Sequence, residues 1–197
     1  MKRIISFPGT VLIALALMTG SIYAETAPAP AAPAAPAALQ HGNLDRKDHE
    51  FLKKAAQINL TEIELGKLAE RLSTDPNVKK IAGMLVKDHA EANQKLERLA
   101  ASKGASIPQE PSIWERHSLN ALQKEQGAKF NEEFLAFSAK GHEKAIALFE
   151  KEAARTQDPD IKAWAQKTLP ELKHHLAMSQ GTKAEAVAEK AKQHKQQ

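Results

Sequence analysis

Two Asp-Pro turns divide most of the chain into long stretches with helical periodicity. The segments "STDPNV" and "TQDPDI" each place an aspartate directly before a proline, at Asp75 and at Asp158. An aspartate can accept hydrogen bonds from the free N–H groups of a helix start, and a proline at the first helical position sacrifices no hydrogen bond. Each turn is therefore expected to end one helix and begin the next.

Apolar side chains recur every three or four residues through four stretches, which is the pattern of helices that bury one face. The first helix is predicted from about Asp48 to Leu72, and the second ends near Lys103 and Gly104. A third helix precedes the second turn, and a fourth follows it. The strings "DPNVKKIA" and "DPDIKAWA" match in order, which indicates an internal duplication of a helical hairpin.

A long segment separates the two hairpins, from Ala105 to Gly127, with a short amphipathic helix around Ile113–Lys124. Up-down bundles use short loops throughout, whereas the ferritin-like arrangement joins two antiparallel pairs by one long crossover. The sequence therefore predicts an all-α protein, a ferritin-like four-helix bundle of two antiparallel hairpins over residues 45–181. The tail, 182–197, is alanine- and lysine-rich and is expected to fray or to extend the last helix.

The first 24 residues have the layout of a secretory signal peptide. A basic start precedes the apolar run "VLIALALM", and small residues surround Ala24, after which cleavage is predicted. An uncleaved membrane anchor is the alternative, although prolines and glycines interrupt the apolar run. Residues 25–44 form an alanine–proline linker that favours extended polyproline II structure. The protein is expected to be periplasmic or secreted, with no stable membrane span after cleavage.

The composition narrows the classes of partner and of chemistry. The chain has no cysteine, which excludes disulfides and a lipid-modified cysteine anchor. Its formal net charge is +4, its charges are mixed along the helices and only 5% of its residues are aromatic, so no nucleic-acid partner is expected. Neither a Gly-x-Ser-x-Gly motif nor a phosphate-binding glycine loop is present, so the sequence does not support hydrolase, kinase or thiol chemistry. Whether the chain is an enzyme stays open, and a non-enzymatic role is favoured. An envelope protein partner or a homo-oligomer stays open.

Four polar side chains occupy helix positions that should point into the bundle. Each long helix contributes one of them: Glu62, His89, His142 and His175. His89, for example, follows Leu85 by four residues and so shares its face. Counted from turns at opposite ends, all four lie near mid-height. Three imidazoles and a carboxylate suit one transition metal ion, such as zinc, copper or iron. The alternative is a metal-free, buried Glu–His hydrogen-bond network.

These residues do not form the di-iron centre of ferritins. Such centres need several glutamates and a Glu-x-x-His motif on each of two helices. The chain has one such spacing, from Glu171 to His174, and Val86 lies three residues before His89. Ferroxidase activity is therefore not expected.

Other polar or helix-breaking residues are interpreted as structural or solvated. Asp88 and Glu91 are expected in solvent, with Asp88 close enough to pair with a neighbouring lysine. Pro170 is expected to bend the last helix one turn before His174. The remaining histidines are expected in solvent: His41, His49, His117 and His194.

Three segments together resemble one bacterial family. They are "EIELGKLAERLSTDPNVKKIAGMLVKDHAEANQKLERLA", "GAKFNEEFLAFSAKGHEKAIALFEKEA" and "DPDIKAWAQKTLPELKHHLAM". They are similar to the exported domain-of-unknown-function family numbered four-one-four-two. Its members are often labelled predicted outer membrane proteins and are assigned to the ferritin-like fold. The resemblance covers about Asp45 to Met178. It implies export and a helical fold, and it leaves the activity open.

Residue by residue, the resemblance selects the same four side chains. The family's glutamate in "EIELG" falls on Glu62, its Asp-His pair ends at His89, and its mid-helix histidine falls on His142. The histidine of "LPELKHHL" that matches the family pattern is His175 rather than His174. The chain departs from the family at Phe130-Asn131, at Phe134 and at "IAGML", away from all four candidates.

Two functional hypotheses follow. The first is an exported helical-bundle protein that binds one metal ion at mid-bundle, in metal or stress handling. The alternative is a non-enzymatic envelope stress or interaction protein with a metal-free Glu/His network.

Overall fold

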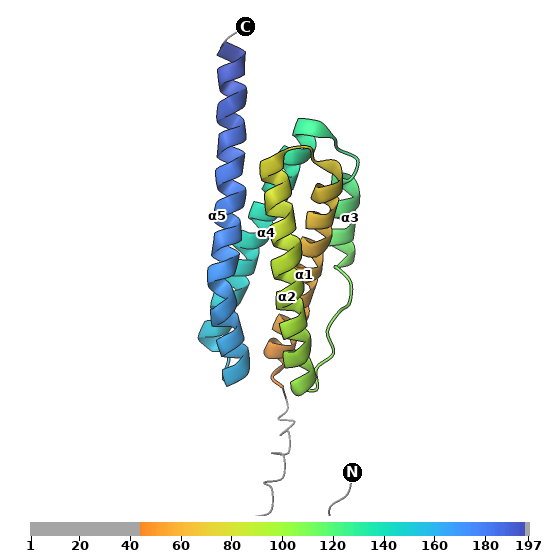
Figure 1. Ribbon diagram of the computed structural model, residues 1–197. Coiled ribbons are helices and arrows are strands. Elements are labelled where there is room, and N and C mark those ends of the chain that lie inside the picture. The colour runs from red at the N-terminus through yellow and green to blue at the C-terminus, as the bar shows by residue number, and fades with distance from the viewer. Residues whose placement is uncertain (1–43, 196–197) are drawn as a thin grey trace, which may run out of the picture. The chain divides into compact units, whose positions relative to one another are not determined.

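The computed structural model describes residues 44–195, and this part of the chain is all-α. It has the following helices (Figure 1): α1 (Arg46–Leu72), α2 (Pro76–Ser102), α3 (Ile113–Leu122), α4 (Gly127–Arg155) and α5 (Pro159–Lys195). The predicted all-α class is confirmed. Among the described residues, no helix combines the length and apolarity needed to cross a membrane. The predicted signal peptide and all but the last residue of the predicted linker lie outside the described residues.

The two Asp-Pro turns are built in the same way. Asp75 and Asp158 each accept hydrogen bonds from two backbone N–H groups of the helix that follows, at 2.8 to 3.2 Å. The hydroxyl groups of Ser73 and Thr156, each two residues earlier, accept the aspartates' own N–H groups at 3.1 Å. Local hydrogen bonding therefore fixes both helix starts, as the sequence predicts.

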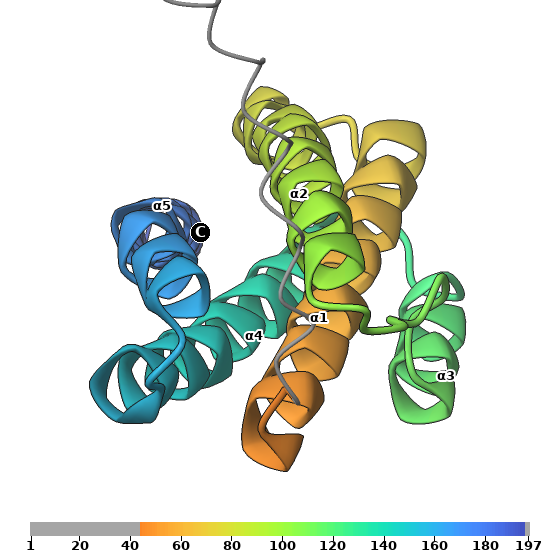
Figure 2. The same ribbon diagram turned by 90° about the horizontal axis from the view of Figure 1, so that it is seen from below.

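The helices pack as two pairs, α1 with α2 and α4 with α5. The pairs meet where α1 contacts α4 and where α2 contacts α5. The α1–α2 turn and the α4–α5 turn lie at opposite ends of the bundle, so that contacting helices run antiparallel (Figure 1). The short helix α3 belongs to the crossover and lies outside the four, against α1 and α4 (Figure 2).

The core is divided along the bundle axis into two apolar clusters. The cluster towards the α4–α5 turn is built around Phe51 and Phe149, whose rings meet edge to face with centroids 5.0 Å apart. The other, towards the α1–α2 turn, contains Phe130 and Phe134. Between them lies a layer of buried polar side chains, to which α1, α2, α4 and α5 all contribute.

The last helix is longer than its partners. It continues through Pro170 and through Gly181, the end of the predicted bundle, as far as Lys195. Residues 182–195 thus extend α5, which was one of the two outcomes expected for the tail.

Candidate metal centre

Three buried histidines meet in the polar layer. His89 comes from α2, His142 from α4 and His175 from α5, and none is more than 1% exposed. His142 Nε2 lies 3.3 Å from His89 Nε2 and 3.3 Å from His175 Nδ1. Two nitrogens that bind one tetrahedral ion at 2.0–2.1 Å stand roughly 3.3 Å apart. The spacing of these nitrogens therefore suits a shared metal ion.

In each ring, the nitrogen that points away from the other two rings faces an oxygen acceptor. The three contacts are His89 Nδ1 to Asn59 Oδ1 (3.0 Å), His142 Nδ1 to the Ser138 carbonyl oxygen (2.8 Å) and His175 Nε2 to Asp88 Oδ2 (3.2 Å). Because a carbonyl or carboxylate oxygen only accepts, these partners assign the single N–H of each neutral ring to its outer nitrogen. The three inner nitrogens are then left with lone pairs directed towards one another.

Burial keeps the three rings uncharged at neutral pH. Loss of hydration is the largest cause of lowered pKa values: it brings the pKa of His142 to about 4 and holds that of His89 well below its ordinary value. Burial also lowers the pKa of His175, against the opposing effect of Asp88. Neutral imidazole is the form that binds a metal ion. The rings are thus in the metal-binding state without first losing protons.

Each metal-free network leaves one unfavourable contact in this centre. If the His142 proton moved to Nε2 it could reach both other rings, and Nδ1 could accept from the Ser138 hydroxyl at 3.4 Å, but the Nδ1 lone pair would then face the Ser138 carbonyl oxygen at 2.8 Å. If the Asn59 amide turned over, its NH₂ group would face His89 Nδ1 and the His89 proton would move to Nε2, from where it could reach His142 Nε2. His175 Nδ1 would still face His142 Nε2 with no proton between them. Moving the His175 proton inward would leave its outer nitrogen lone pair against the Asp88 carboxylate. A cation removes the conflict without any of these rearrangements.

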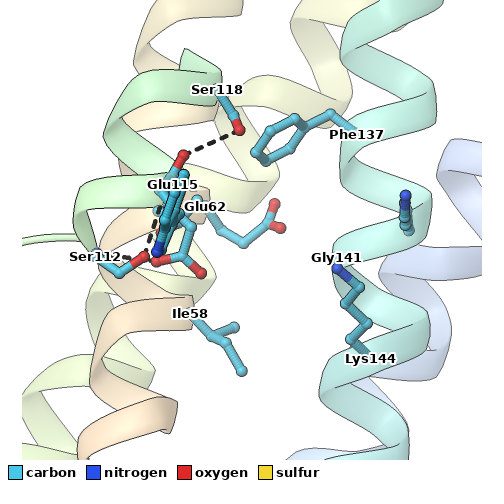
Figure 3. A pocket seen from close by; sticks show the side chains of 11 residues that line it. Ile58, Glu62, Ser112, Glu115, Ser118, Phe137, Gly141 and Lys144 are labelled. Carbon is cyan, nitrogen blue, oxygen red and sulfur yellow. Dashed lines mark hydrogen bonds between the residues drawn. The ribbon is translucent and has the colours of Figure 1, made fainter. Parts of the chain in front are cut away.

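The fourth predicted residue, Glu62, is buried but points elsewhere. Its Oε1 approaches His142 Nδ1 at 3.9 Å, which is the outer nitrogen of that ring. The group of described residues whose ligand atoms lie within 4.8 Å of one another contains His89, His142 and His175, without Glu62. The glutamate is directed instead towards Gly141 and Phe137, into a pocket (Figure 3). Its assignment as a metal ligand therefore stays a prediction.

Asp88 is more than a solvated charge. As expected, it pairs with Lys87, at 3.1 Å from Nζ, but it also accepts a hydrogen bond from the buried ring of His175. Together with Glu171, these two residues form a second group whose ligand atoms lie within 4.8 Å of one another, on the outer side of the ring. Glu91, the other predicted surface charge, is exposed and pairs with Lys95 at 2.6 Å.

Sequence reasoning missed one partner and misjudged one histidine. Asn59 lies on the buried face of α1, one turn before Glu62, and that position was the available signal. His49 was expected in solvent, but it is partly buried because its Nε2 approaches the Ser106 carbonyl oxygen at 3.2 Å. His117 and His174 are exposed. His41 and the side chain of His194 fall outside the described residues.

Fold and site together define a class of protein: a helical bundle with three buried histidines at its middle. The chain belongs to the family described as "Domain of unknown function (DUF4142)", whose sequence profile matches residues 30–182. The resemblance seen in the sequence is thereby confirmed. No curated protein matches the chain.

Two solved structures have similar folds. The DUF305 fragment from Deinococcus radiodurans has a TM-score of 0.64 at 13% identity, and the match covers 71% of this chain and 97% of that fragment. CopM in its Cu(II)-bound form has a TM-score of 0.58 at 14% identity, covering 70% of this chain and 96% of CopM. At such identities the likeness shows the fold alone.

Proposed function

We propose that this protein binds one transition metal ion between His89, His142 and His175 and serves in metal or stress handling. The observation that carries the proposal is the direction of the three inner nitrogens. With the proton of each ring on its outer nitrogen, all three inner nitrogens carry lone pairs, and one cation would satisfy them together. We also propose that residues 1–24 direct export of the protein and that the two hairpins have the ferritin-like topology.

The proposed role is binding rather than catalysis. Each of the three rings is almost fully buried, so that a substrate has no surface on which to meet the ion. Three neutral imidazoles suit zinc, copper, iron or nickel, and ligand type does not choose among them. Copper is the first ion to test, because CopM, which has a similar fold, was solved with Cu(II) bound. Glu62 is the proposed fourth ligand only if its side chain turns towards the rings when the ion enters.

A second candidate is an envelope stress or interaction protein with a metal-free polar centre. The distances of 3.3 Å between ring nitrogens favour it, since they also lie within reach of a long hydrogen bond. In this case the histidines would contribute to stability and to acid response, and a partner protein would carry the function.

Elemental mass spectrometry distinguishes the two. The untagged chain is incubated with copper, zinc or iron, freed of excess ion and analysed beside two variants. His142→Ala removes the ring whose Nε2 lies 3.3 Å from a nitrogen of each of the other two, whereas His174→Ala removes an exposed histidine of α5, next to His175 in the chain. We expect close to one ion per chain in the wild type and in His174→Ala, and none in His142→Ala. A wild-type chain that retains none of the three metals would overturn the proposal and leave the metal-free centre.

A further inference from the structure

A pocket of about 440 Å³ lies between α1, α3 and α4 (Figure 3). Its volume falls in the range of small-molecule sites, roughly 300–1,000 Å³. Four kinds of side-chain group line it: apolar side chains (Ile58, Trp114, Phe137), carboxyl groups (Glu62, Glu115), ammonium groups (Lys140, Lys144) and hydroxyl groups (Thr61, Ser112, Ser118). It is a different site from the histidine centre, because none of the three histidines lines it.

The pocket contains a buried carboxyl group with an unused oxygen. Glu62 is 2% exposed, and its Oε2 has no hydrogen-bond partner among the described residues. An unsatisfied buried polar group of this kind costs about 1–3 kcal/mol. Gly141 makes room for it, since a Cβ atom at that position would stand 2.7 Å from Glu62 Oε1. Burial raises the pKa of Glu62 well above its ordinary value, so the empty pocket favours the uncharged acid. A cationic hydrogen-bond donor that reached this oxygen from the pocket would stabilise the carboxylate form.

The opposite wall carries positive charge. Lys140 and Lys144 lie one turn apart on α4, on either side of Gly141, and both are exposed. In Figure 3 the Lys144 side chain rises along α4 towards the level of Gly141, across the pocket from Glu62. Two lysines at this spacing can share one carboxylate. The two lysines therefore favour an anionic group of a ligand, and the apolar side chains favour an apolar body between that anion and Glu62.

We propose that this pocket binds a small zwitterion, an α-amino acid with an apolar side chain. Its ammonium group would donate to Glu62, its carboxylate would meet Lys140 and Lys144, and its side chain would pack against Ile58, Phe137 and Trp114. A simple anion would face two glutamates, and a metal cation would face two lysines and leave the apolar walls unused. A purely apolar ligand would leave the Glu62 oxygen unpaired.

Matched probes test the charges separately by isothermal titration calorimetry on the full chain. L-leucine carries both charges, 3-methylbutylamine lacks the carboxylate and 4-methylpentanoate lacks the ammonium group, and L-phenylalanine tests a larger side chain. We expect at least one of the two amino acids to bind. If leucine binds, each of its two single-charge analogues should bind at least about tenfold more weakly than leucine does. No heat from either amino acid at about 10 mM would overturn the proposal, as would amine binding equal to that of the amino acid.

Variants identify the groups involved. Glu62→Gln keeps the shape of the side chain and should weaken amino-acid binding at least about tenfold, whereas Glu64→Gln, on the exposed side of α1, should leave it unchanged. The double variant Lys140→Ala and Lys144→Ala should weaken amino-acid binding and leave 3-methylbutylamine unaffected. Circular dichroism checks that each variant folds. Unchanged affinity in a folded Glu62→Gln variant would remove Glu62 from the site and overturn the assignment.

Discussion

The bundle buries two polar clusters, and they differ in where their positive charge comes from. Near the α4–α5 turn, Arg155 Nη2 lies 2.8 Å from Glu152 Oε2 and 3.0 Å from Asp48 Oδ1. The Thr156 hydroxyl donates to the other Asp48 oxygen at 3.1 Å. This carboxyl cluster therefore contains its own cation. The histidine centre presents three lone pairs to one another, and no lysine or arginine is among its recorded contacts in the described part of the chain.

The difference distinguishes a structural cluster from a candidate metal site. Burial is the largest cause that raises the pKa of Glu152, to about 7, and it is also the largest cause that lowers the pKa of His142, to about 4. Both environments thus favour uncharged side chains. In the carboxyl cluster, Arg155 supplies the positive charge from within the chain. In the histidine centre, the proposed metal ion would supply a positive charge from outside the protein.

The largest expected effect is stabilisation of the histidine centre by metal. At an ion concentration about 1,000 times the dissociation constant, binding to the folded state alone raises the free energy of unfolding by about 4 kcal/mol. We expect this increase for the wild type and for His174→Ala, and none for His142→Ala. Urea unfolding followed by circular dichroism, with and without the ion, measures it. An equal increase in His142→Ala would show that the metal binds elsewhere, and the proposed difference between the two clusters would then be wrong.

Removing the internal cation should expose the dependence of the carboxyl cluster on it. Arg155→Met keeps an apolar side chain of similar length and leaves Asp48 and Glu152 buried without their partner. Breaking a buried ion pair from one side costs about 3 kcal/mol, at the lower end of the usual range because Arg155 is partly exposed. The loss in the free energy of unfolding should be full at pH 8 and smaller at pH 5, where Glu152, with a pKa of about 7, is protonated. Arg98→Met, at an exposed position of α2, is the control.

The sequence predicts what local interactions determine. The helix starts at Asp75 and Asp158 depend on residues within the turns, and both were predictable. Helix spacing also places His89, His142 and His175 on buried faces, because periodicity reports which face of a helix turns inward. The boundaries differ little: α1 begins at Arg46 rather than Asp48, and α3 is the short crossover helix expected near Ile113.

What the sequence does not predict depends on contacts between helices. Periodicity puts Glu62 on a buried face, and it is buried, but only the position of α4 shows that it turns towards Gly141 and the outer nitrogen of His142 rather than towards the inner nitrogens. The contact of Asp88 with His175 joins α2 to α5. The carboxyl cluster likewise joins the first turn of α1 to the last turn of α4, so it cannot be predicted from a short sequence motif.

Asn59 provides a sharper test of the histidine centre. Asn59→Asp keeps an oxygen that can only accept a hydrogen bond from His89 Nδ1, so the His89 lone pair stays directed inward. We expect metal affinity to be retained or increased in this variant. Asn59→Leu removes the acceptor and should weaken metal binding about ten- to a hundredfold, the usual effect of losing such a partner. Competition against a coloured chelator measures both affinities. Loss of binding in Asn59→Asp would show that the amide donates to His89, as the metal-free network requires.

The smallest expected effect is a dependence on pH that is opposite in sign for the two clusters. Glu152 has a pKa of about 7 in the folded state, above the ordinary value of 4.5, so its contribution to stability is complete below pH 4.5 and is lost as the pH rises through 7. His142, with a lowered pKa, loses its contribution as the pH falls from 6.5 towards 4. Glu152→Gln cannot ionise and should remove the first dependence only.

Relative to this variant, the free energy of unfolding of the wild type, measured with urea, should fall by about 1–2 kcal/mol between pH 5 and pH 8, after allowance for screening by the partly exposed Arg155. Glu150→Gln, on the exposed side of α4, should follow the wild type. A wild-type curve parallel to that of Glu152→Gln would mean that Arg155 fully offsets the burial of this carboxyl group.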